Sequence, residues 1–270
     1  MNAGGGISGG AAGSGLEYAA EIQELTRSVV SRFVSADGLA VDYGKLEGSA
    51  DLKSFEAKIQ RLADLDPSLF EGRGQRLSFW INLYNLLVIR EVVRSGAFKA
   101  AGLEKEFFKR RICTIAGSAL SLNDIEYGIL RGNAPRSYLV WGQFYPGDKR
   151  RRLMLDPCEP RVCFALVKAS RSGPPLRFFE AEGIEGQLYR AAVDFIRNGG
   201  VVINREENTI TLSHIFKSRA RDFGGSQGAM RFITRHMESP GDAAYICLHA
   251  GKDKTRFRDC DQILNRQSEK

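Results

Sequence analysis

The chain has 270 residues, of which 43% are hydrophobic and 26% are charged, and its formal net charge is +7. This composition excludes a globally disordered protein, and the length suits one large domain or two small ones. The 39 basic residues outnumber the 32 acidic ones, and this excess could favour an acidic protein, a nucleic acid or an anionic membrane surface. No apolar run reaches the ~18 residues that would span a bilayer, so we predict no transmembrane segment.

The cysteines and histidines indicate a reducing compartment and no metal centre. The five cysteines are scattered without a CxxC pair, and the three histidines form no HxxxH pair. This spacing is not that of a secreted disulfide framework or of a closed zinc site. We therefore expect an intracellular protein, cytoplasmic in the first instance, with no metal and no cofactor.

The predicted elements begin with helices. Residues 1–15 are rich in glycine and serine, a composition that is typical of a flexible tail. Apolar residues at three- and four-residue spacing predict helices over 16–34 and 51–65. The segment 76–94 is apolar on nearly all sides, which is typical of a central buried helix.

Two asparagines, Asn82 and Asn85, lie one helical turn apart within this apolar segment. A buried amide without partners costs about 1–3 kcal/mol, so both side chains must find hydrogen bonds. We interpret them as groups that hold loop backbone in place, and alternatively as direct contributors to a site.

The rest of the sequence predicts hairpins mixed with helices. Alternating apolar residues around turn residues indicate β-hairpins over 111–122 and 201–212. Caps and helical spacing predict further helices over 123–131, 184–198, 214–223 and 227–237. The apolar segment 244–250 is predicted as a strand, and residues 266–270 are expected to fray. This order favours a single α+β domain over 16–265 rather than alternating βαβ units.

Two side chains are candidates for catalysis. Glu126 lies in an apolar setting, where a carboxyl could act as a general acid or base, or could accept hydrogen bonds from a structural arginine. Cys163 lies in an apolar run that leads to a basic, glycine- and proline-rich turn. A lone cysteine in such a run is commonly a small buried hydrophobe, and alternatively a nucleophile.

Basic residues supply the candidate binding groups. A run of four resembles a phosphate-contacting patch, and alternatively a solvated loop tip: Lys149, Arg150, Arg151 and Arg152. Arg131 and Arg161, with Arg177, could converge on an anion, or could tie loops through carboxylates such as Glu126 and Asp156.

Several motifs follow one another in a characteristic order: 41–43, 79–85, 121–131, 159–175, 212–223 and 260–265. Together they resemble the family called domain of unknown function 547. The resemblance implies a single globular domain with a papain-like or transglutaminase-like fold. In plants and algae such domains occur beside leucine zippers, glutaredoxin and DEP modules, which implies scaffolding and regulation.

The sequence departs from the family's pattern where the family carries reactive side chains. Tyr127 and Cys163 stand where the family usually has histidine, and Lys168 and Gly173 stand at two of its usual cysteine positions. The imidazole and paired sulfur groups that could activate a nucleophile or hold zinc are therefore nearly all replaced.

We therefore predict a non-catalytic binding or scaffold module that acts through protein partners in a larger assembly. One alternative is a thiol-dependent hydrolase or acyl-transferase that uses Cys163, with the base and the orienting group drawn from Glu126, His214, His249 and Asn85. A further alternative is a binder of nucleic acid or anionic membrane that uses the basic segments 109–111 and 149–152. Convergence of the candidate residues in an open cleft would favour the enzyme, and a plugged arrangement would favour the binding module.

Overall fold

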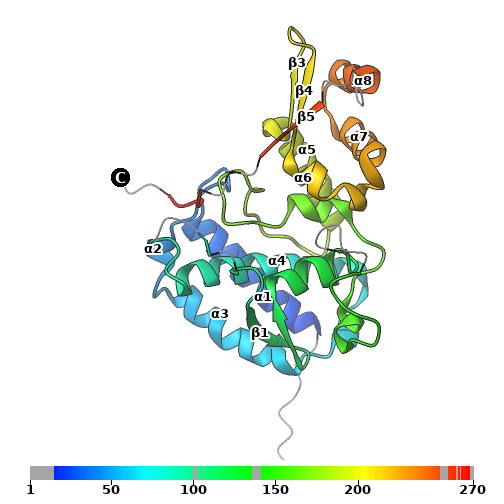
Figure 1. The fold of residues 1–270 in the computed structure, drawn as a ribbon. Coiled ribbons are helices and arrows are strands. Elements are labelled where there is room, and N and C mark those ends of the chain that lie inside the picture. The colour runs from blue at the N-terminus through cyan, green and yellow to red at the C-terminus, as the bar shows by residue number, and fades with distance from the viewer. Residues whose placement is uncertain are drawn as a thin grey trace, which may run out of the picture.

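The computed structural model describes residues 15–99, 103–104, 106–135, 141–249, 255–259, 261 and 263–267. The chain folds into a lower region, coloured blue to green, and an upper region, coloured yellow to red (Figure 1). Each region has its own cluster of buried apolar side chains. The expected glycine-rich tail lies outside the described residues except for Gly15, which is the first residue of a helix.

The lower region is built around one buried helix, as the sequence predicted. This helix is α4 (Gly72–Arg94), and every residue over 77–93 is buried. Two predicted amphipathic helices pack near it, α1 (Gly15–Phe33) and α3 (Ala50–Arg61), and a short α2 (Tyr43–Leu46) precedes α3. The Ser49 side chain accepts a hydrogen bond from the Leu52 N–H and so caps α3.

The first predicted hairpin is confirmed and lies against the end of α3. Strands β1 (Arg111–Ile115) and β2 (Ser118–Ser121) pair antiparallel. The turn residues Ala116 and Gly117 have φ values of 49° and 64°, which suit a tight hairpin turn. Their N–H groups donate to the carbonyls of Leu62 and Ala63 at 2.9 and 2.7 Å, and these bonds fix the hairpin on the lower region.

The short helix expected after this hairpin is a π-helix, η3 (Asp124–Leu130), and its Asn123 side chain does not cap it. The Asp124 carboxylate instead accepts hydrogen bonds from the N–H and the hydroxyl of Ser121. The wider π turn directs Glu126 into the interior, where 2% of the residue is exposed.

The upper region combines a small sheet with helices. The predicted hairpin is confirmed as β3 (Val201–Asn204) and β4 (Thr209–Ser213), and β5 (Thr255–Arg258) pairs parallel with β4. The surrounding helices are α5 (Ile184–Phe195), η6 (Ile196–Gly200), α6 (His214–Ser218), η7 (Ala220–Phe223), α7 (Gly225–His236) and α8 (Pro240–His249). This mixture of helices and small sheets confirms the α+β class.

The strand predicted over 244–250 is wrong, because its described residues, 244–249, belong to helix α8. Ser239 starts this helix by accepting hydrogen bonds from the N–H groups of Asp242 and Ala243. A short apolar run has no periodicity that distinguishes a strand from a helix. The helix-starting residue Ser239, which precedes the run, therefore determines that this segment is helical. Strand β5 comes from the basic segment beyond α8, where no element was expected.

The end of the described chain forms a strap, residues 263–267, that ties distant segments together. The Val41 N–H donates to the Asn265 carbonyl at 2.8 Å, and the Gln267 N–H donates to the Val41 carbonyl at 3.0 Å. On its other side the strap accepts a hydrogen bond from the Arg171 N–H through the Ile263 carbonyl. Two residues that were expected to fray, 266 and 267, are therefore held in the fold, and residues 268–270 lie outside the described chain.

The two asparagines of α4 hold loop backbone, which confirms that interpretation. Asn82 donates to the Phe179 carbonyl at 2.7 Å and accepts from the Phe179 N–H at 2.9 Å. Asn85 donates to the Ala165 carbonyl at 2.9 Å and accepts from the Val167 N–H at 3.0 Å. Each side-chain amide thus bonds loop backbone as a neighbouring strand would, by one donated and one accepted hydrogen bond. Together the two amides fix the path of the loops that carry the candidate site.

Within the part of the chain that the structure describes, no helix combines the length and the apolarity that crossing a membrane would require.

Replacing Asn85 by alanine should lower the free energy of unfolding by about 2–5 kcal/mol, because a buried N–H and a buried carbonyl both lose their partner. Urea denaturation followed by circular dichroism measures the change. The matched control is Asn198→Ala, an exposed position, where the expected effect is below about 0.5 kcal/mol. Equal effects at the two positions would contradict the structural role of Asn85.

Candidate functional site

Glu126, Cys163, Lys168 and Gly173 meet where the two regions join. They line a cavity of about 30 Å³ together with residues from the upper region: Glu126, Arg131, Cys163, Leu166, Lys168, Ser170, Gly173, Pro174, His214, Ile215 and Arg219. Positions that are far apart in the sequence thus lie around one cavity, a convergence that the sequence alone left open. A cavity of this volume has room for about one water molecule.

Glu126 is the centre of the site. Its carboxylate accepts hydrogen bonds from the Lys168 ammonium and from the Arg219 guanidinium, and it forms an ion pair with each. The Tyr84 hydroxyl lies 3.4 Å from the same carboxylate and accepts a hydrogen bond from Lys168 at 2.8 Å. The interpretation of Glu126 as an acceptor for a structural arginine is confirmed, and the arginine is Arg219, which precedes η7.

The charges around Glu126 fix its ionisation state. Burial raises the pKa of Glu126, but the positive charges of Arg219 and Lys168 lower it by more, and the resulting pKa is about 2. Burial also lowers the pKa of Lys168 to about 8, against the opposing attraction of Glu126. At neutral pH the carboxylate is therefore ionised and neutralised by two cations, so it has no proton to donate and is a poor base.

Cys163 lies in the 3₁₀ turn η5 (Pro160–Phe164), at the edge of the upper core. Its thiol donates a hydrogen bond to Asp222 Oδ2, at a distance of 3.6 Å. Burial, followed by the negative charge of Asp222, raises the pKa of the Cys163 thiol to about 12. The group is therefore protonated at neutral pH, whereas a reactive cysteine needs to be a thiolate.

A second buried ion pair closes the site beside this thiol. Arg131 donates to both carboxylate oxygens of Asp222, at 2.6 and 2.9 Å, and both side chains are 3% exposed. The guanidinium groups of Arg131 and Arg219 lie 4.7 and 4.9 Å from the Tyr127 ring centroid. Arg219 also donates to the Tyr127 hydroxyl at 2.8 Å. Tyr127 thus packs against two arginines.

The other groups considered for a thiol mechanism have different surroundings. His214 lines the cavity, and burial lowers its pKa, but the thiol's hydrogen bond goes to Asp222. His249 lies on α8, where its ring stacks on Tyr245 at 4.1 Å between centroids. The Asn85 amide bonds the loop backbone through both its nitrogen and its oxygen.

The three arginines that could have converged on an anion are not brought together. Arg131 pairs with Asp222, Arg161 pairs with Glu159 and Glu185, and Arg177 pairs with Asp194. Each is paired with a carboxylate, as the second interpretation expected, but none of these carboxylates is Glu126 or Asp156.

The basic run 149–152 forms the 3₁₀ helix η4 (Lys149–Leu153), where a loop was expected. The Lys149 ammonium donates to the Gly117 carbonyl at 3.0 Å, and Arg152 donates to the Ala116 carbonyl at 2.5 Å. Arg150 pairs with Asp148 and with Asp124. These bonds hold the run against the first hairpin, so it differs from a freely solvated loop tip.

The sequence reasoning did not identify Tyr84, Arg219 and Asp222 as parts of the site. All three lie within the motif ranges 79–85 and 212–223, and this was the signal that could have pointed to them. Arg219 lies 93 residues from its partner Glu126, and a single sequence carries no signal that pairs two charges over such a distance. Among the described residues, no group of three or more His, Cys, Asp and Glu side chains could hold a metal ion.

Comparison with known families supports the resemblance drawn from the motifs. A family model described as "Protein of unknown function, DUF547" matches residues 68–196, which confirms the resemblance. The matched segment contains Asn85, Glu126, Cys163 and Lys168, and it ends before Arg219. No curated protein and no solved structure matches the chain, so kinship with papain-like or transglutaminase-like folds stays a prediction.

Acid should weaken the fold through Glu126. This group binds a proton near pH 4.5 in the unfolded chain and near pH 2 in the folded chain, so its contribution is present above pH 4.5 and is lost as the pH falls towards 2. The shift corresponds to about 3 kcal/mol. Glu126→Gln should destabilise the protein at pH 7 and should remove this part of the acid dependence.

Urea denaturation between pH 2 and 7 measures both effects. Glu206→Gln is the control, because Glu206 is an exposed residue of the turn between β3 and β4. If Glu126→Gln keeps the acid slope of the wild-type protein, the carboxylate does not carry the proposed charge network.

Proposed function

We propose that this protein is a non-catalytic binding or scaffold module that acts through protein–protein contacts. The observation that carries the proposal is the closed ion-pair network of Glu126, Lys168 and Arg219. Both cationic side chains are bound to one buried carboxylate, which leaves them unavailable to a substrate.

The size of the cavity supports a role other than catalysis. Pockets for small molecules are typically about 300–1,000 Å³, whereas this cavity measures about 30 Å³. Opening it for a substrate would mean separating Lys168 and Arg219 from a buried carboxylate. Breaking a buried pair in this way typically costs about 3–5 kcal/mol.

The chemistry of the remaining groups supports the same conclusion. A thiol enzyme needs a thiolate, and the pKa of Cys163 is about 12 because the thiol is buried beside Asp222. The neighbouring arginine is occupied by bidentate hydrogen bonds to that same aspartate. The thiol's acceptor is a carboxylate that Arg131 already binds, and burial beside this negative charge favours the protonated form of the thiol.

The network has a structural role that suits a binding module. Glu126 lies between Ile125 and Ile129 of the lower core, while Arg219 follows Phe216 of the upper core. The Glu126–Arg219 pair and the Arg131–Asp222 pair therefore join the two cores. This supports the proposal that residues 16–265 act as one unit with a fixed surface. The described cysteines are free, which supports a reducing intracellular compartment.

Two exposed aromatic side chains that precede η4 in the sequence are candidates for contact with a protein partner. Trp141 and Tyr145 are 64% and 69% exposed, and tryptophan and tyrosine are enriched in protein interfaces. The basic side chains beside them are bound to backbone carbonyls and to aspartates. A protein partner is therefore better supported than a nucleic acid, which would need those cations free to contact phosphates.

Thiol labelling tests the absence of catalysis. In the native protein at pH 7.5, iodoacetamide should modify the exposed Cys247 first, and Cys163 should react only after denaturation, because it is a buried neutral thiol. Peptide mapping by mass spectrometry follows each site over time. Cys163→Ala identifies the Cys163 peptide. Labelling of Cys163 faster than Cys247 would refute the proposal in favour of the thiol enzyme.

Partner binding tests the scaffold role directly. A partner captured on the full chain should form a complex of fixed stoichiometry by light scattering, and Cys163→Ala should leave its Kd unchanged. Trp141→Ala or Tyr145→Ala should weaken binding at least about tenfold, as for truncated aromatic anchors. Tyr189→Ala, at an exposed site on α5, is the control. Loss of binding in a folded Cys163→Ala protein would overturn the proposal.

A further inference from the structure

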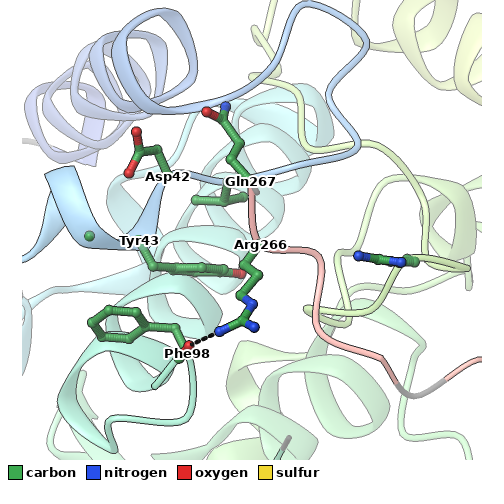
Figure 2. A pocket seen from close by; sticks show the side chains of 8 residues that line it. Asp42, Tyr43, Phe98, Arg266 and Gln267 are labelled. Atoms are coloured by element: carbon green, nitrogen blue, oxygen red, sulfur yellow. Dashed lines mark hydrogen bonds between the residues drawn. The ribbon is translucent and has the colours of Figure 1, made fainter. Parts of the chain in front are cut away.

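A second cavity lies away from the ion-pair network, beside the C-terminal strap. Its volume is about 360 Å³, which falls in the usual range for a small-molecule site. It is lined by residues 41–44, Phe98, Arg171 and residues 266–267. Figure 2 shows Asp42 and Tyr43 from the start of α2 meeting Arg266 and Gln267 from the strap.

The walls of this cavity are fixed by hydrogen bonds between distant segments. The strap pairs with Val41 through two backbone hydrogen bonds. The Tyr43 hydroxyl donates to Asn265 Oδ1 at 2.8 Å, in a buried contact. Arg266 Nη1 donates to the Phe98 carbonyl at 3.1 Å (Figure 2). The cavity is thus preformed, which lowers the entropic cost of binding.

The charge in the cavity favours an anion. Arg171 and Arg266 contribute two guanidinium groups. The negative charge of Asp42 is compensated by Lys45, whose ammonium lies 2.9 Å from Asp42 Oδ2. The side chain of Arg171 forms no hydrogen bond or ion pair with the described residues, so its donors remain available. A guanidinium group offers five donors in a planar fork that fits a carboxylate or a phosphate.

The apolar part of the cavity favours a planar body on the ligand. The Tyr43 and Phe98 rings are stacked, with centroids 6.1 Å apart and an interplanar angle of 30°. Tyr43 is 2% exposed and supports Phe98 from behind, so the half-buried Phe98, with the Lys99 ammonium 5.0 Å from its ring centroid, is the ring that can contribute apolar contact area to a ligand. We propose that this cavity binds a small organic oxyanion, a carboxylate or phosphate monoester on a planar apolar body, through Arg171 and Arg266. The site is separate from the proposed scaffold role.

Calorimetric titration of the full chain tests this site with benzoate, phenyl phosphate, inorganic phosphate and the neutral benzamide. At least one of the two aromatic anions should bind with a Kd below about 1 mM, and the comparison between them distinguishes a carboxylate from a phosphate. Inorganic phosphate and benzamide should bind at least about tenfold more weakly. The proposal is overturned if neither anion binds, if benzamide binds equally well, or if inorganic phosphate binds equally well.

Variants place the binding in the cavity. Arg171→Gln and Arg266→Gln should each weaken binding of the anion about tenfold or more, as expected for a charged hydrogen bond. Arg205→Gln makes the same charge change at an exposed residue paired with Asp242 and should leave the Kd unchanged. If Arg266→Gln does not fold, Arg171→Gln still decides. Unchanged binding in Arg171→Gln, or an equal loss in Arg205→Gln, overturns the assignment.

Discussion

The ion pairs of Glu126 with Lys168 and Arg219 are the interaction on which the rest of the site depends. A carboxylate that is 2% exposed is stable as an anion only if opposite charges and hydrogen bonds replace the water it has lost. Lys168 comes from the loop that Asn85 holds, and Arg219 comes from the turn between α6 and η7. The position of this carboxylate therefore determines where the segments that carry Lys168 and Arg219 must lie.

Lys168 and Tyr127 extend the charge network around Glu126. The Lys168 ammonium brings a positive charge to Glu126, and Tyr127 offers a ring and a hydroxyl to Arg219. A histidine and a cysteine at these positions could exchange protons with a substrate. The side chains present instead neutralise one another, and their ion pairs connect the two cores.

Much of this structure could be predicted from the sequence, and the failures have physical reasons. Helix α4 and both hairpins were predictable because an apolar run and turn residues are local signals. The segment in α8 was not, because a short apolar run suits both a strand and a helix and Ser239 decides between them. At the site, Glu126 and Cys163 were recognisable as polar side chains in apolar segments, but the pairing of Glu126 with Arg219 and of Arg131 with Asp222 depends on long-range packing.

The strap joins the last described residues of the chain to residues 41–43, near its beginning. Tyr43 and Asn265, which share a buried hydrogen bond, are separated by 222 residues. Contacts of such separation carry a loop-closure entropy that must be overcome before they contribute stability, and they slow folding. The helices of the lower region can pack from nearby sequence, whereas the strap can dock only once both of its neighbours are in place. Docking of the strap is therefore expected to be a late step in folding.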